Sequence, residues 1–322
     1  METKLNQLNH IYQELKESLK WKVSDKRILM TIASIYVINH KEFRVDRFRA
    51  IAEKIKDHAS VFSSLRSQSR FTTAAMLDVN FEQPENKIQD LFNLYDLYRA
   101  EKFASGTYTY IAASILLTRA QANPEKTIQR AKELYNGMKK EHVFLTSSDD
   151  YPLATLLALE EASNVIERME EFYVALNNEG LSKGNHLQFL SHILTLGSAA
   201  DASTLINRTT AVADSLKLAG IKSKTIYYPI FGMLALLPHE KFAAEQIVSI
   251  YESLNQEKEF KWQKDMNFML AASFFVHDEL EHDGLAETSL TTILEAILQA
   301  QQAVMIATIT AATAASSSSN GS

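Results

Sequence analysis

The clearest pattern along the chain is a recurrence of apolar positions with the period of an α-helix. Ile88, Leu91, Phe92 and Tyr95 follow the spacing i, i+3, i+4 and i+7. This spacing places the four side chains on one face of a helix, and similar stripes occur along most of the chain. The pattern therefore predicts an all-α protein.

The helical stripes repeat along the chain. Residues 84–89 (Pro-Glu-Asn-Lys-Ile-Gln) reappear as residues 124–129 (Pro-Glu-Lys-Thr-Ile-Gln). In both segments the proline and the glutamate suit the first turn of a helix, where the N–H is dispensable and the helix dipole favours an anion. A small residue among bulky ones marks the second helix of each unit at Ala33, Ala74, Ala113, Ala154, Ser191, Gly232 and Ala272.

A large apolar residue recurs near the turn that joins the two helices of a unit. These residues are Trp21, Phe62, Phe103, Phe144, Leu181, Ile221 and Phe260. Two helices cannot bury their apolar faces alone, but a stack of pairs can, so the repeat predicts an α-solenoid-like stack of about seven two-helix units of ~40 residues.

The repeat also predicts how the chain is organised. We expect a helical-repeat domain over residues 1–278 and a short acidic link at 279–284. Residues 279–315 are expected to hold an amphipathic helix that caps the last repeat, with self-association as the alternative. Residues 316–322 are low in complexity and are expected to be disordered.

Composition narrows the class of protein. The chain has only 9 glycines and 5 prolines in 322 residues, which fits long helices and short loops. It has no cysteine, which excludes disulfides, thiolate nucleophiles and cysteine-bound zinc. A net charge of −6 gives no overall attraction to nucleic acid or anionic lipid. Without a secretion signal or a run of about 18 apolar residues, we expect a cytoplasmic protein with no nucleic-acid or membrane partner.

Candidate chemistry gathers in three polar turns. Arg66 and Arg70 are spaced to share a helix face, where two guanidinium groups would hold a phosphate or carboxylate. The alternative is a solvated face, or ion pairs with Asp149 and Asp150. These two aspartates suggest an acid–base pair or a cation site, or else N-caps for the helix that Pro152 opens.

The third turn contains histidines. His192 is interpreted either as a core histidine or, if it faces a groove with Asn185 and Gln188, as a proton-transfer group. The ligand-binding candidates are Arg66, Arg70, Asp149, Asp150, Tyr151, Asn185, His186, Gln188 and His192.

No sequence motif indicates a metal or a cofactor. The local cluster that most resembles metal ligands contains His277 and His282, but their spacing of five differs from the i, i+4 pair that a helix uses for zinc. The common nucleotide-loop and hydrolase motifs are absent from the sequence. We therefore expect no metal and no cofactor, and the sequence leans against an enzyme.

Several runs resemble a known family. They are residues 62–67 (Phe-Ser-Ser-Leu-Arg-Ser), 70–71, 137–140, 144–147, 149–154 (Asp-Asp-Tyr-Pro-Leu-Ala) and 183–194 (Lys-Gly-Asn-His-Leu-Gln-Phe-Leu-Ser-His-Ile-Leu). They are similar to a family of Gram-positive bacteria known only as a domain of unknown function, family 4003. The resemblance implies a single bacterial cytoplasmic protein and transfers no activity. Its most distinctive run includes Asn185, His186 and His192.

Two functions remain open at this point. One is a helical-repeat binding or scaffold protein that recognises a peptide or protein partner. The alternative is a protein that binds a small molecule or anion, or an enzyme, with a polar pocket formed by the second to fourth repeats. Either protein would be a monomer or a homodimer.

Overall fold

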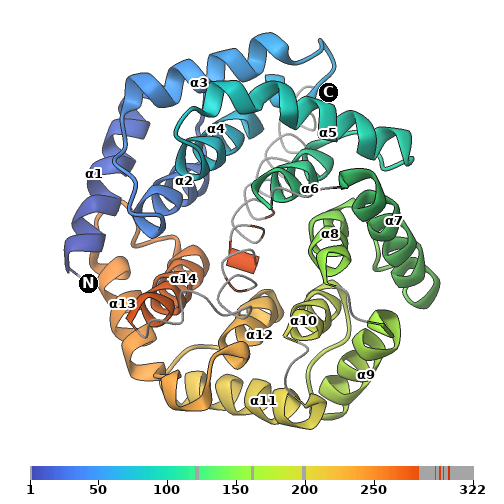
Figure 1. Cartoon of the computed structure of the whole chain (residues 1–322). Helices are drawn as coiled ribbons and strands as arrows, with labels where there is room; N and C mark the ends of the chain where they lie inside the picture. The colour runs from blue at the N-terminus through green and yellow to red at the C-terminus, as the bar shows by residue number, and fades with distance from the viewer. Residues whose placement is uncertain are drawn as a thin grey trace, which may run out of the picture. The chain divides into compact units, whose positions relative to one another are not determined.

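The computed structural model describes residues 2–119, 123–160, 163–197 and 201–282, together with Leu294, Ile297, Leu298, Ala300 and Val304. These residues contain fourteen α-helices longer than one turn and no β-strand, which confirms the all-α fold. The helices are α1 Glu2–Leu19, α2 Lys26–Ile38, α3 Val45–His58, α4 Ser69–Asn80, α5 Ile88–Ala100, α6 Thr107–Thr118, α7 Pro124–Glu141, α8 Tyr151–Leu159, α9 Val165–Asn178, α10 Asn185–Leu196, α11 Ala202–Leu218, α12 Tyr228–Leu236, α13 Ala244–Gln256 and α14 Lys264–His282 (Figure 1).

The chain divides into two compact units. The first consists of residues 1–128 and 299–322, and the second of residues 129–298. Helices α1 to α6 belong to the first unit and α8 to α14 to the second, while α7 begins in the first and lies mostly in the second.

In the first unit, consecutive helices form pairs. Helix α1 packs with α2, α3 with α4, and α5 with α6. The first helices of neighbouring pairs also contact one another, α1 with α3 and α3 with α5, and so do the second helices, α2 with α4 and α4 with α6. The pairs therefore stack as two layers of helices, as the repeat predicts.

The second unit follows the same plan. Its pairs are α9 with α10, α11 with α12, and α13 with α14. Helices α8, α10, α12 and α14 contact in succession, as do α9, α11 and α13 (Figure 1). Helix α7 meets α8 through the rings of Tyr135 and Tyr151, whose centroids lie 4.9 Å apart. The prediction of stacked helical pairs is confirmed.

The two layers differ in how they are buried. First helices are amphipathic: α3 buries Phe48, Ile51, Ala52 and Ile55, and none of its charged residues is buried. Second helices are apolar nearly all round, and in α2 every residue from Ile28 to Ile38 is buried. A helix that is apolar on all sides must be enclosed, so polar side chains on the second layer become buried with it.

The small residues predicted for the second helices are all buried. Their role is clearest at Gly232 in α12. A Cβ atom there would stand 2.5 Å from Leu190 Cδ1 of α10, which is closer than two carbon atoms can approach. Glycine therefore permits the close contact between α10 and α12.

The apolar turn residues behave differently from the small residues. Phe103, Leu181, Ile221 and Phe260 are buried, whereas Trp21, Phe62 and Phe144 face solvent. The recurrence in the sequence therefore combines two structural positions. In the turn between α1 and α2 the buried residue is Val23, two residues after the exposed Trp21. In the turn between α3 and α4, the buried residue is Leu65.

The end of the repeat also differs from the expectation. Helix α14 continues to His282, so residues 279–282 are helical rather than part of the link expected at 279–284. Leu294, Ile297, Leu298 and Ala300 are helical and buried. Most of the predicted capping helix at 279–315, and the tail at 316–322, lie outside the described residues.

Candidate functional site

The candidate residues separate between the two units. Arg66 and Arg70 belong to the first unit, Arg66 in the turn between α3 and α4 and Arg70 in the first turn of α4. The others belong to the second unit, where they lie in the turn before α8, at the first residue of α8, and in α10. The members of this second group are Asp149, Asp150, Tyr151, Asn185, His186, Gln188 and His192.

The two arginines stabilise the backbone of their own turn. Arg66 ends the 3-10 turn η1 (Ser64–Arg66) and Arg70 lies in the first turn of α4, so they do not share one helix as their spacing predicts. Arg70 is buried, and its Nη1 donates to the carbonyl oxygens of Arg66 and Ser67, each at 2.8 Å. The exposed Arg66 donates through Nε to the Ala59 carbonyl at 3.1 Å. The Arg70 guanidinium is thus engaged by the chain itself.

The two aspartates lie in the 3-10 turn η3 (Ser148–Asp150), directly before α8. Asp150 is buried, and its Oδ2 accepts the Ser147 N–H at 2.9 Å to close a capping box around η3. The Ser147 hydroxyl donates to the Asp149 carboxylate. Neither side chain caps α8, and the N-cap of η3 is Ser147, with Asp150 as the third residue of the capping box. The interpretation of Asp149 and Asp150 as N-caps for the helix that contains Pro152 is therefore wrong.

Asp150 faces His192 of α10. The distance between His192 Nδ1 and Asp150 Oδ1 is 3.7 Å, longer than a hydrogen bond. Burial, reinforced by the charge of Asp149 and opposed by the Ser147 N–H, raises the pKa of Asp150 to about 7. Burial, reinforced by His142, lowers the pKa of His192 to about 3. Near neutral pH the contact therefore joins a neutral imidazole to a carboxyl group that is close to half protonated, rather than two opposite charges.

Gln188 lies one helical turn before His192 and is buried beside it. Its Nε2 donates to Thr146 Oγ1 at 2.8 Å, and the Thr146 hydroxyl donates to the Met138 carbonyl at 3.2 Å. Gln188 Oε1 and His192 Nδ1 have no hydrogen-bond partner among the described residues. A buried polar atom without a hydrogen-bond partner costs about 1–3 kcal/mol of folding free energy. These two atoms therefore make the site a candidate for binding a small molecule.

The sequence did not identify His142 as part of this site, although its charge contributes to the lowered pKa of His192. His142, just after α7, places Nε2 2.8 Å from Glu170 Oε1, and its ring centroid lies 4.4 Å from that of Tyr173. We call Asp150, His192, Gln188, Thr146 and His142 the buried polar cluster. His142 stands immediately before the apolar turn at Val143 and Phe144, which is a usable signal, but no spacing in the sequence connects it with Glu170.

The remaining candidates lie around this cluster. Tyr151 is buried against Tyr135. Asn185 and His186 are exposed at the start of α10. Desolvation lowers the pKa of His186, and the carboxylate of Asp149 opposes that shift. The fold thus brings Asp149 near His186, which is exposed, in addition to the buried contact of Asp150 with His192.

A second candidate surface is formed by apolar side chains at the turns within helix pairs. Trp21 is 90% exposed and Phe62 98% exposed in the first unit. In the second unit, Phe144 is 99%, Leu218 89% and Trp262 79% exposed. We call the turns that carry these five exposed side chains the apolar turns. Exposed aromatic residues that recur at equivalent positions are typical of contact surfaces.

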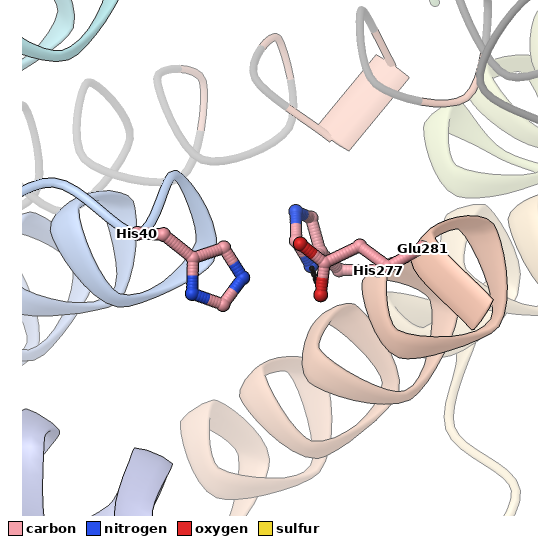
Figure 2. A group of neighbouring side chains, drawn as sticks. All are labelled: His40, His277 and Glu281. Carbon is pink, nitrogen blue, oxygen red and sulfur yellow. Dashed lines mark ion pairs between the residues drawn. The ribbon is translucent and has the colours of Figure 1, made fainter.

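His277, the first residue of the local cluster that most resembles metal ligands in the sequence, makes an ion pair within α14. His277 Nδ1 lies 3.6 Å from Glu281 Oε2, one turn further along α14 (Figure 2, which also draws His40 of the first unit). Such i, i+4 pairs are common on helices and stabilise them weakly.

The stacked pairs place this chain among the α-helical repeat proteins. No α-helix in the described part of the chain combines the length and apolar character needed to cross a bilayer.

The chain belongs to a family described as protein of unknown function (DUF4003), whose model matches residues 11–303. It is similar to the "Uncharacterized protein YeaA" of Bacillus subtilis (strain 168), with 36% identity over 315 residues, 97% of this chain and 95% of the relative. No solved structure matches the chain. The family resemblance inferred from the sequence is confirmed.

Proposed function

We propose that this protein is a helical-repeat binding or scaffold protein that recognises a protein or peptide partner through the apolar turns. The observation that carries the proposal is the nearly complete exposure of Trp21, Phe62 and Phe144 at corresponding turns. Aromatic side chains are the residues that most often dominate binding energy when a partner covers them.

Neighbouring turns support a shared surface in the first unit. Lys22 follows Trp21, and its Nζ donates to Glu53 of α3 at 2.9 Å. Arg70, at the end of the next turn, approaches the same carboxylate at 3.8 Å. The turns that carry Trp21 and Phe62 therefore lie side by side, and one partner segment can span both.

The test places a photo-crosslinking amino acid at Phe62 of the full chain, in the bacterium that makes it. A matched control carries the same group at Asn86, which is exposed between two pairs. We expect one protein to be crosslinked at position 62 and not at 86. That protein, once purified, should bind at least tenfold more weakly to the Trp21→Ser and Phe62→Ser variants, because the aromatic anchors are lost. Identical adducts at both positions, or equal affinity of the variants, would contradict the proposal.

A second function, binding or conversion of a small molecule, is favoured by the unpartnered Gln188 Oε1 and His192 Nδ1. A carboxyl group with a pKa near neutrality next to an imidazole is suited to proton transfer. The expected sign is a small molecule retained in native mass spectra of the protein from its own cytoplasm, and lost from the Gln188→Leu variant. A ligand-free spectrum in both would oppose this alternative.

A further inference from the structure

The strongest unassigned feature is a concentration of lysines on one edge of the second unit, although the chain as a whole carries a net charge of −6. The residues are exposed and come from the α11–α12 turn with the end of α11, and from the α13–α14 turn with the start of α14. We call this surface the lysine-rich edge, and its members are Lys217, Leu218, Lys222, Lys224, Ile226, Lys258, Lys261, Trp262 and Lys264.

The two turns form one surface because direct bonds connect them. Lys224 Nζ donates to Asp265 Oδ1 of α14 at 2.5 Å, and the Tyr227 hydroxyl donates to the same oxygen at 2.5 Å. Helices α11 and α13 also contact each other, as do α12 and α14. Leu218 and Trp262 therefore stand on the same edge of the stack.

The charges on this edge are strongly biased in one turn and mixed in the other. Residues 215–239 contain no aspartate or glutamate. Lys217 and Lys222 in that stretch make no ion pair with any described residue. In the other turn, Glu257 and Glu259 alternate with Lys258 and Lys261. A partner must therefore be anionic opposite the first turn and able to match both signs opposite the second.

This mixture distinguishes a polypeptide from a lipid surface. An anionic membrane is uniformly negative and would repel Glu257 and Glu259 when Trp262 entered its interface. A peptide places carboxylates against the lysines, a cation or amide against the glutamates, and apolar side chains against Leu218 and Trp262. The Lys261 ammonium lies 5.2 Å from the centroid of the Trp262 ring, so cationic and aromatic contacts are offered side by side to such a partner.

We propose that the lysine-rich edge binds an acidic polypeptide segment whose apolar side chains cover Leu218 and Trp262. This inference rests on the proposed function and specifies the partner's chemistry for the second unit. Association with such a segment should weaken as salt rises, because exposed charges are screened over about 10 Å at 0.1 M ionic strength.

The experiment selects a random twelve-residue peptide library on the full chain and on two variants. The test variant is Lys217→Glu with Lys222→Glu. The control is Lys54→Glu with Lys126→Glu, which makes the same charge change at exposed sites in the first unit. We expect the enriched peptides to combine aspartate or glutamate with aromatic residues or leucine. Their affinity should fall at least tenfold for the test variant and less than twofold for the control.

The other outcomes separate the possible failures. Enriched peptides without acidic residues that still require Trp262 would overturn this inference and leave the proposed function standing. Binding of vesicles containing phosphatidylglycerol that is lost in Trp262→Ser, without any enriched peptide, would assign the edge to lipid. No enriched peptide and no vesicle binding would contradict both the inference and the proposed function in this unit.

Discussion

Two buried aspartates, one in each unit, are surrounded in opposite ways. Asp78 of α4 is 1% exposed, and its carboxylate accepts from Arg47 Nε at 2.6 Å and from the Tyr36 hydroxyl at 2.8 Å. Asp150 is similarly buried but has one backbone N–H, the negative Asp149 beside it and a neutral imidazole at 3.7 Å. The two aspartates are therefore similarly buried but differ in the groups that surround their carboxyl oxygens.

The difference assigns different roles to the two networks. Asp78 joins α2, α3 and α4 through fully engaged polar groups, and burial next to this carboxylate raises the pKa of Tyr36. Such a satisfied network fixes the packing of a stack. Asp150 lacks a cation and titrates near neutrality, so its environment suits proton exchange rather than rigid connection.

The largest expected loss of stability comes from removing the cation of the first network. Arg47→Ala leaves the Asp78 carboxylate buried without an opposite charge and should lower the free energy of unfolding by about 3 kcal/mol. Urea denaturation at pH 7 measures the change. Arg49→Ala, which removes an exposed arginine from the same helix, should change it by less than about 0.5 kcal/mol. Equal effects of the two substitutions would show that Asp78 does not depend on Arg47.

A gain of stability of comparable size is expected at Asp150, and it should depend on pH. The pKa of this carboxyl in the folded protein, about 7, lies above the ordinary value of 3.8. Its contribution to stability is therefore fully present below about pH 4 and is lost as pH rises toward 7. Asp150→Asn removes that loss, so the free energy of unfolding of the variant should exceed that of the wild type by about 4 kcal/mol at pH 8 and match it near pH 4.

Denaturation of both proteins at several pH values checks this prediction. His192 has the opposite dependence, because its lowered pKa makes stability fall between about pH 6.5 and 3. That contribution is present in both proteins and largely cancels in their difference. A stability difference that is constant with pH would mean that Asp150 is not protonated near neutrality.

The smallest effect concerns the neighbour of Asp150. Asp149→Asn removes a negative charge that contributes to the raised pKa of Asp150. The loss of stability with rising pH should therefore end at a lower pH, and stability at pH 8 should rise by about 0.5 kcal/mol. Carbon-13 NMR titration of the Asp150 carboxyl reports the shift directly. If the pKa of Asp150 were unchanged or higher in this variant, the charge of Asp149 would not contribute to raising it.

Much of the candidate site could be anticipated, though not its arrangement. Asp150, Gln188 and His192 were found because polar residues in two turns stand beside apolar helical stripes. His142 was missed because it follows the last turn of a first helix, where a basic residue is ordinary. Arg66 and Arg70 were expected to share a helix face, but a 3-10 turn separates their elements and the Arg70 side chain folds back onto carbonyl groups.

The burial of the apolar turn residues could also not be predicted from the sequence period. The period identified Phe62, Phe103 and Phe144 as equivalent landmarks, yet only Phe103 is buried. Hydrophobic periodicity reports the face of a helix, whereas the direction of a side chain in a turn depends on the turn's length and backbone angles.

The sequence by itself determined the all-α class, the paired helices, the repeat length and the small residues that permit close packing. These features follow from local spacing and from the need to bury apolar stripes. Only the tertiary structure decided which polar atoms meet. Tyr36 bonds Asp78, Gln188 bonds Thr146, and His192 faces Asp150, each across about one repeat. A period identifies equivalent positions, but hydrogen bonds and charge depend on distances between layers that are set only when neighbouring pairs pack.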